Sequence, residues 1–112
     1  MRMRNDNRDD KVLSYRAKVM LLRTVSRLKL DINPPERKYF VEELVNIIKS
    51  DEKLRSKVVN ELREYLKVCL DACEEYRKKF LLTLNAFFVA KAEAWLYEAE
   101  VTSELLKFLT RS

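Results

Sequence analysis

The stretch VVNELREYLKVCLDACEEYRKKFLLTLNAF, residues 58–87, decides the fold class. Its apolar residues recur at intervals of mostly three or four positions, as on one face of an α-helix. They are Val58, Leu62, Tyr65, Leu66, Cys69, Cys73, Tyr76, Phe80, Leu84 and Phe87. Neither glycine nor proline interrupts this pattern between residue 52 and Ser112. We therefore predict helix through most of this half of the chain.

A single helix over residues 52–110 would be about 88 Å long, at a rise of about 1.5 Å per residue. A compact domain of this size has a radius of gyration of only about 13 Å. The helix must therefore fold back on itself or extend into an oligomer. We expect a break between Arg77 and Asn85, where Thr83 or Asn85 can cap the next helix. The run Asp71-Ala72-Cys73-Glu74 has the pattern of a capping box and marks an alternative break.

The N-terminal half carries two further helical patterns. In Asn33-Pro34-Pro35-Glu36, asparagine suits an N-cap, proline suits the first helical turn, and glutamate completes a capping box. The helix that follows has a core stripe of Phe40, Val41, Leu44, Val45 and Ile48. The first helix has a core stripe of Leu13, Ala17, Met20, Leu21, Thr24 and Leu28. The junction Ser50-Asp51-Glu52 supplies a cap for the third helix.

The predicted fold class is all-α, a small antiparallel bundle of four or five helices, as a monomer or a dimer. Residues 1–8 are expected to form a basic mobile arm, and residues 9–112 a single helical-bundle domain. Its helices are predicted at about residues 9–30, 34–49, 52–79 and 84–110. Between Phe80 and Leu96 apolar residues surround the helix axis, so this segment is expected to be the central and most buried helix.

Glycine and histidine are both missing from the 112 residues. Without glycine, the phosphate-binding loops of nucleotide-binding enzymes cannot form. Without histidine, the chain lacks the commonest general base and metal ligand. Its neighbouring carboxylates, such as Glu42-Glu43 and Glu74-Glu75, are typical of a solvated helix face, and Glu93 alone could project into the bundle. We therefore expect no enzymatic activity, no small-molecule substrate, no cofactor and no metal site.

Cys69 and Cys73 lie four residues apart on the core stripe of the third helix. Successive helical turns hold such a pair too far apart for a disulfide, and two thiols without histidine cannot complete a structural zinc site. Both are interpreted as small core residues.

The composition also bears on environment. The abundance of lysine, arginine and glutamate, together with the absence of glutamine, is typical of proteins from thermophiles. The N-terminus has no secretory leader pattern and no segment has the length and apolarity of a membrane span, so we expect an intracellular, cytoplasmic protein without membrane contact.

The net charge of +5 is concentrated near the N-terminus, because residues 1–31 contain nine Lys and Arg against four Asp. Arginines at helical spacing can donate bidentate hydrogen bonds to phosphates. The leading hypothesis is therefore a non-enzymatic nucleic-acid-binding protein, or an accessory subunit of a nucleoprotein complex, that acts through its basic first helix. The residues that would bind nucleic acid or an acidic protein surface are Arg16, Arg23 and Arg27, followed by Lys11, Lys18 and Arg8.

Two further surfaces are candidates. The second and third helices could form a helix-turn-helix, in which Lys53, Lys57 and Asn60 would be secondary nucleic-acid contacts. A second apolar side of the first helix could meet another chain through Val12, Tyr15, Val19 and Leu22. The alternative hypothesis is accordingly a protein–protein adaptor or homodimeric scaffold with no nucleic-acid role, and either hypothesis predicts a homo-oligomer or a subunit of a larger complex.

Overall fold

The computed structural model describes residues 13–30 and 40–111, and this part of the chain is all-α. Its helices are α2 (Tyr15–Leu28), α3 (Phe40–Ser50), α4 (Glu52–Thr83) and α5 (Ala86–Thr110). The all-α class is confirmed for the described residues. The predicted arm over residues 1–8 and the capping box Asn33-Pro34-Pro35-Glu36 lie outside them.

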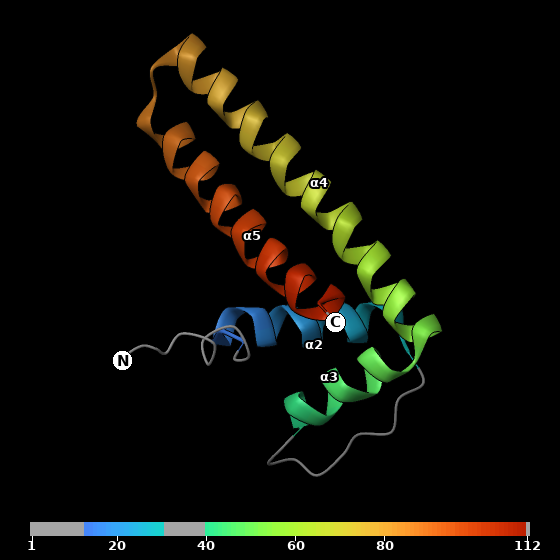
Figure 1. Ribbon diagram of the computed structural model, residues 1–112. Helices are drawn as coiled ribbons and strands as arrows, with labels where there is room; N and C mark the ends of the chain where they lie inside the picture. The colour runs from blue at the N-terminus through green and yellow to red at the C-terminus, as the bar shows by residue number, and fades with distance from the viewer. Residues whose placement is uncertain (1–12, 31–39, 112) are drawn as a thin grey trace.

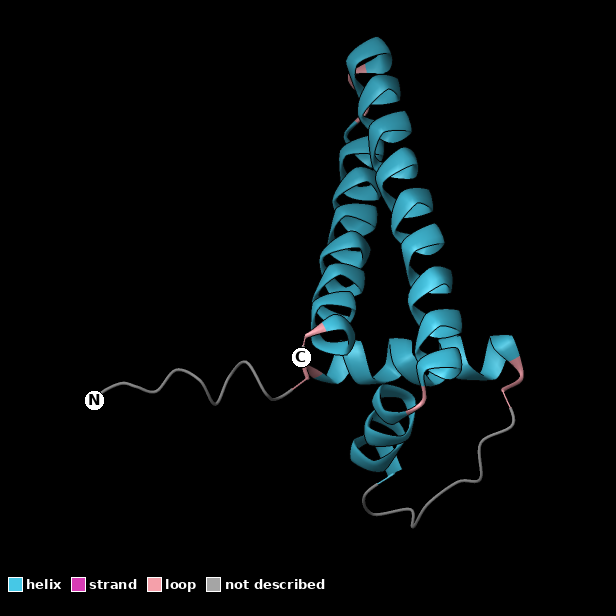
Figure 2. Cartoon of the chain, turned by 45° about the vertical axis from the view of Figure 1, so that its right-hand side comes forward, coloured by secondary structure: helices cyan, strands magenta, loops and turns pink. Residues whose placement is uncertain are grey.

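The two longest helices form a projecting hairpin. The chain reverses between α4 and α5, which then lie side by side along most of their length, while α2 and α3 lie at one end of the pair (Figure 1). In a second view α2 crosses the base of the hairpin (Figure 2). The far end of the hairpin stands clear of both α2 and α3. The radius of gyration is 16.7 Å, against about 13 Å for a compact domain of this length. The shape is therefore elongated because the hairpin projects.

Polar side chains fix the beginnings of three helices. The Ser14 hydroxyl accepts a hydrogen bond from the Ala17 amide at 3.2 Å. A carboxylate oxygen of Asp51 accepts from the amides of Lys53 and Leu54. The side-chain oxygen of Asn85 accepts from the Phe87 amide at 2.9 Å. The predicted caps at Asp51 and Asn85 are confirmed.

The helices end without glycine. Lys29 and Leu84, which terminate α2 and α4, both have positive φ, at 52° and 57°. The left-handed conformation crowds the Cβ atom of any residue other than glycine, at a cost of about 1–2 kcal/mol. The chain therefore accepts strain at these two helix ends.

The core lies where all four described helices meet, at the base of the hairpin. It is built from the predicted stripes of α2, α3 and α4, completed by one side of the last turns of α5. The most deeply buried large side chains are Leu21, Leu44, Ile48, Leu62, Leu105 and Leu109.

Several predicted boundaries need correction. The first helix begins at Tyr15, because Ser14 is its cap, and residues 9–12 of its predicted range are not described. The third helix continues to Thr83 rather than residue 79, and Asp71-Ala72-Cys73-Glu74 lies inside it. That run does not break the helix, because the apolar stripe continues in phase on both of its sides.

The expectation that residues 80–96 form the most buried helix is wrong. Leu82 is 85% exposed, Leu84 74% and Leu81 68%. Apolar residues on every side of a helix are buried only if neighbours surround that helix, and at the far end of the hairpin α4 and α5 have just each other within the described chain (Figure 2).

Candidate interaction surfaces

The basic residues of α2 were the leading sequence-based candidates. Arg16, Arg23 and Arg27 are all exposed, and Lys18 is half-buried. Arg8 and Lys11 lie outside the described residues.

Acidic and aromatic residues from other helices contact most of these cations. Nε of Arg27 donates to a carboxylate oxygen of Glu61 on α4 at 3.0 Å. Lys18 pairs with Glu42 on α3 at 3.9 Å, and the guanidinium of Arg16 lies 5.1 Å from the ring centroid of Tyr97 on α5. Part of the positive charge of α2 is therefore used in holding the base together. Arg23 has no ionic partner among the described residues.

The other predicted surface residues are accessible to different degrees. Lys53, Lys57 and Asn60 are exposed near the start of α4, within the base of the molecule. In the predicted apolar side of α2, Tyr15 is 78% exposed, whereas Val19 and Leu22 are half-buried. Val12 lies outside the described residues.

A polar cluster links α4 to α5 halfway along the hairpin. The Tyr65 hydroxyl donates to Oε2 of Glu98 at 3.1 Å, and burial, with the neighbouring Cys69 and Glu98, raises the pKa of Tyr65 to about 12. Burial also raises the pKa of the Cys69 thiol. Both cysteines are free thiols, and Cys69 is fully buried, as predicted for a core residue, while Cys73 is half-buried. The cluster supplies a hydrogen bond between the two helices of the hairpin.

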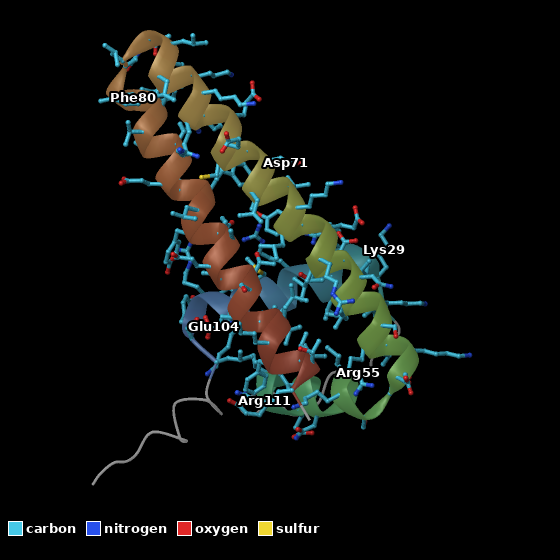
Figure 3. All side chains as sticks on the ribbon, turned by 45° about the horizontal axis from the view of Figure 1, so that its top comes forward. Lys29, Arg55, Asp71, Phe80, Glu104 and Arg111 are labelled. Atoms are coloured by element: carbon cyan, nitrogen blue, oxygen red, sulfur yellow. The ribbon has the colours of Figure 1, made fainter. Side chains whose placement is uncertain are left out.

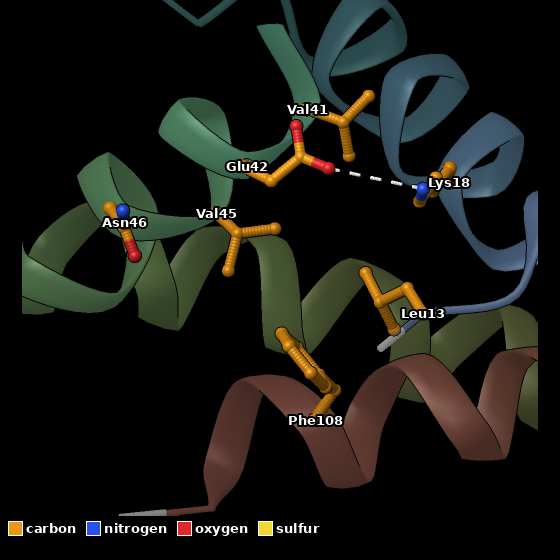
Figure 4. Close-up of a pocket in the computed structure, with 7 residues that line it drawn as sticks. All are labelled: Leu13, Lys18, Val41, Glu42, Val45, Asn46 and Phe108. Atoms are coloured by element: carbon orange, nitrogen blue, oxygen red, sulfur yellow. Dashed lines mark ion pairs between the residues drawn. The ribbon is translucent and has the colours of Figure 1, made fainter. Parts of the chain in front are cut away.

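A shallow pocket lies between α3 and the end of α5 (Figure 4). Its polar side chains include Lys18 and Glu42, which pair with one another across its rim. The remaining lining is mostly apolar, from Leu13, Val41, Val45 and Phe108, with Asn46 at one side. Because its two charged groups are already paired, the pocket offers a ligand little to recognise.

Several large apolar side chains are exposed at the far end of the hairpin, the end at which Figure 3 labels Phe80. Phe87 is 58% exposed, in addition to Leu81, Leu82 and Leu84. Further towards the base, four more large side chains are 45–52% exposed: Val68, Leu70, Leu96 and Tyr97. Leu81, Leu82, Leu84 and Phe87 lie close together in sequence at the turn of the hairpin, and contiguous exposed apolar patches typically mark interaction sites.

Lysines and aromatic rings lie together on one side of this end. Nζ of Lys79 is 5.2 Å from the ring centroid of Tyr76, and Nζ of Lys91 is 6.0 Å from the same ring. Tyr76 stacks on Phe88 at 6.1 Å between ring centroids, and Phe87 meets Phe88 edge-on at 5.5 Å. No aspartate or glutamate occurs between Tyr76 and Ala92, so this end of the hairpin is both apolar and positively charged.

The sequence contained a signal for this surface that was interpreted as burial. The apolar residues between Phe80 and Leu96 were recognised, but composition alone does not distinguish a helix surrounded by its own chain from one that awaits a partner. The lack of acidic residues between Tyr76 and Ala92 could have drawn attention to the same segment.

Within the described ranges no three His, Cys, Asp or Glu side chains gather closely enough to hold a metal ion. None of the described helices combines the length and apolarity needed to cross a bilayer. No protein-family model matches the chain, and neither a curated protein nor a solved structure shows significant similarity to it.

Proposed function

We propose that this protein is a non-enzymatic helical assembly protein that binds another protein chain through the far half of its α4–α5 hairpin. The observation that carries the proposal is the exposure of eight large apolar side chains along that half of the hairpin. The base contains a closed core, whereas beyond Tyr97, which contacts Arg16 of α2, each hairpin helix has only the other helix beside it in the described chain (Figures 1 and 2).

Burial of this surface would stabilise a complex. Removing apolar surface from water contributes roughly 25 cal/mol per Å². Protein interfaces also place large apolar side chains at their centre and charged groups at their rim. Leu81 and Phe87, with Arg77 and Lys91 nearby, have this composition.

The test is the size of the native assembly in extracts of the source cell. We expect the wild-type protein to elute in an assembly larger than one chain, and the variant with Leu82→Glu and Leu84→Glu to leave it. Both leucines are exposed, so the fold should tolerate glutamate. The control is Lys53→Glu, an exposed change of charge at the base. Retention of the double variant in the assembly would contradict the proposal.

A second candidate function is binding of nucleic-acid phosphates by α2. The observation that favours it is the exposure of Arg16 and Arg23, of which Arg23 has no ionic partner among the residues of the described chain. Each phosphate contact that is lost should reduce the slope of log affinity against log salt by about 0.9 for duplex DNA.

This candidate is tested by fluorescence anisotropy with labelled duplex DNA and single-stranded RNA over a salt series. The variant with Arg16→Ala and Arg23→Ala should bind more weakly and with a shallower salt slope. Arg55→Ala, which removes a cation that already donates to the Lys49 carbonyl, is the matched control. An unchanged slope in the double variant would exclude α2 as the binding site.

A further inference from the structure

One side of the hairpin carries a regular stripe of apolar and charged side chains on each of its helices. On α4 the spacing is four, seven and four residues, and on α5 it is four, three and four. Because an α-helix has about 3.6 residues per turn, each set lies along one side of its helix. These residues, here called the open face, are Leu66, Leu70, Arg77 and Leu81 of α4, and Val89, Glu93, Leu96 and Glu100 of α5.

The two stripes lie on the same side of the hairpin. Lys79 and Lys91 both contact the ring of Tyr76, so they mark one side of the pair. At about 100° per residue, Leu70 lies about half a turn from Lys79, and Leu96 lies about 140° from Lys91. Both stripes therefore lie on the side opposite to the lysines.

Helix α2 does not cover the open face. It contacts Glu61 through Arg27 and Thr102 through Met20. Glu61 precedes Lys79 by five helical turns and Thr102 follows Lys91 by three, so both contacts are on the lysine side. Figure 1 shows the hairpin from the other side, with α2 passing behind it. The start of α2 also contacts α5 beside the open face, since Arg16 lies 5.1 Å from the Tyr97 ring centroid and Ser14 donates to Glu104. Six residues of the open face nevertheless remain exposed: Leu70, Arg77, Leu81, Glu93, Leu96 and Glu100.

The open face has exposed leucines on both of its helices and charges of opposite sign on α4 and α5. Three of its four leucines are exposed, Leu81 at 68%, Leu70 at 49% and Leu96 at 45%, while Leu66 is half-buried. Its charges are divided by helix, since α4 contributes Arg77 whereas α5 contributes Glu93 and Glu100, all exposed. Glu74 partly neutralises Arg77 at 2.9 Å, with both side chains more than half exposed.

We propose that the open face binds a second copy of this chain, so that two hairpins pack as a four-helix bundle with their tips at the same end. This inference rests on the proposed function and names its partner. A twofold axis along the hairpin places α4 of one copy on α5 of the other. Two contacts show which residues of α4 and α5 lie at the same level along the hairpin axis. They are the hydrogen bond between Tyr65 and Glu98 and the stack of Tyr76 on Phe88. Those levels bring leucine against leucine and leave Arg77 about 10 Å along the axis from Glu93 of the second copy, a distance that the two long side chains can span.

The opposite orientation is less favourable. A twofold axis across the hairpin would place α5 on α5, so that Glu93 and Glu100 of one copy would face glutamates of the other. Like charges in register destabilise an interface. The lysine side is also a poor surface for self-association, because it would bring Lys79 and Lys91 of two copies together. The open face is the side of the hairpin whose charges suit its own copy.

The first test is sedimentation of the purified full chain over a wide concentration range. The wild type should approach twice the 13.4 kDa of one chain. Leu70→Glu should weaken dimerisation by about 30-fold or more, as loss of a central interface residue does. Lys53→Glu is the control, because Lys53 is exposed at the base of α4 and lies outside the hairpin surface. It should leave the dimer intact.

The second test reverses charges. Arg77→Glu and Glu93→Arg should each weaken the dimer, and the two together should restore it. If Arg77 acted only through its ion pair with Glu74, Arg77→Glu would lower thermal stability, and Glu93→Arg would not restore the dimer. Helix content and melting temperature are therefore measured in parallel. The orientation is tested with Leu84→Cys and a short thiol cross-linker, which should join two copies only if the tips meet.

A chain that stays monomeric at every concentration overturns the inference, as does a dimer that Leu70→Glu leaves intact. Failure of Leu84→Cys to cross-link a stable dimer overturns the parallel arrangement. A monomer in isolation whose native assembly still depends on Leu82 and Leu84 would reject the second copy as partner and leave the proposed function standing. If the native assembly is also unaffected by those changes, both fail.

Discussion

The hydroxyl of Tyr65 on α4 donates a hydrogen bond to Oε2 of Glu98 on α5 at 3.1 Å, and this contact joins the hairpin near its middle. It lies above the closed core at the base and below the apolar tip. Removal of the hydroxyl in Tyr65→Phe should cost about 1 kcal/mol of unfolding free energy near neutral pH, as for a typical hydrogen bond. Urea unfolding followed by circular dichroism measures the change.

The same residue predicts a pH dependence. The folded-state pKa of Tyr65 is about 12, above its ordinary value of 10. The folded chain therefore favours the protonated phenol, and the resulting stability is complete below pH 10 and is lost as pH rises to 12. The unfolding free energy of the wild type should fall more steeply over this interval than that of Tyr65→Phe. Lysine side chains titrate in the same range in both proteins, so the difference between them reports Tyr65. Equal slopes for the two proteins would refute the assignment.

Leu62 tests the location of the core. It is fully buried among α2, α3 and α5. Leu62→Ala should lower the unfolding free energy by about 2–5 kcal/mol, through lost burial and the cavity left behind. Leu82→Ala at the exposed hairpin end should change it by less than about 0.5 kcal/mol. Comparable losses at the two positions would show that the hairpin end is also packed in the isolated chain.

A substitution at Leu84 tests whether the positive φ of this residue strains the turn between α4 and α5. Leu84→Gly should stabilise the chain by up to about 1 kcal/mol, because glycine adopts φ of 57° without the Cβ clash. The greater freedom of glycine in the unfolded chain offsets part of the gain. The control is Leu82→Gly within α4, which should destabilise by about 1 kcal/mol. Thermal melts of both variants decide the point.

Asn85 tests the start of α5. Asn85→Ala removes the acceptor of the Phe87 amide and should cost about 1 kcal/mol, whereas Asn85→Asp should retain most of the stability. Loss of stability in both variants would mean that the amide group, rather than the capping oxygen, matters at this position.

Local features of the fold could be predicted from sequence because their causes are local. The stripe of Ala17, Met20 and Leu21 is buried as expected, since helical periodicity alone places these side chains on one face. Asn85 was recognised as a cap because its preference depends on a single turn. The break in the long pattern followed from the length of the helix it would otherwise form.

Long-range features could not be predicted in the same way. The pairing of Arg27 with Glu61 spans 34 residues and depends on how α2 crosses α4. The exposure of Leu81 and Leu82 depends on which neighbours are absent, and an apolar pattern carries no information about that. Both the basic character of α2 and the apolar character of the hairpin end can be recognised in the sequence. Only the fold shows that the charges of α2 are partly neutralised and that the apolar side chains of the hairpin end are exposed.

The most direct test of the central claim is site-specific photo-cross-linking in the source cell. A photoreactive amino acid replaces Leu96 on the hairpin in one variant and Lys57 at the base in another. We predict that the Leu96 probe captures a protein chain in high yield and that the Lys57 probe does not. A Leu96 probe that captures no protein, or no more than the Lys57 probe, would contradict the assignment of the hairpin as the assembly surface.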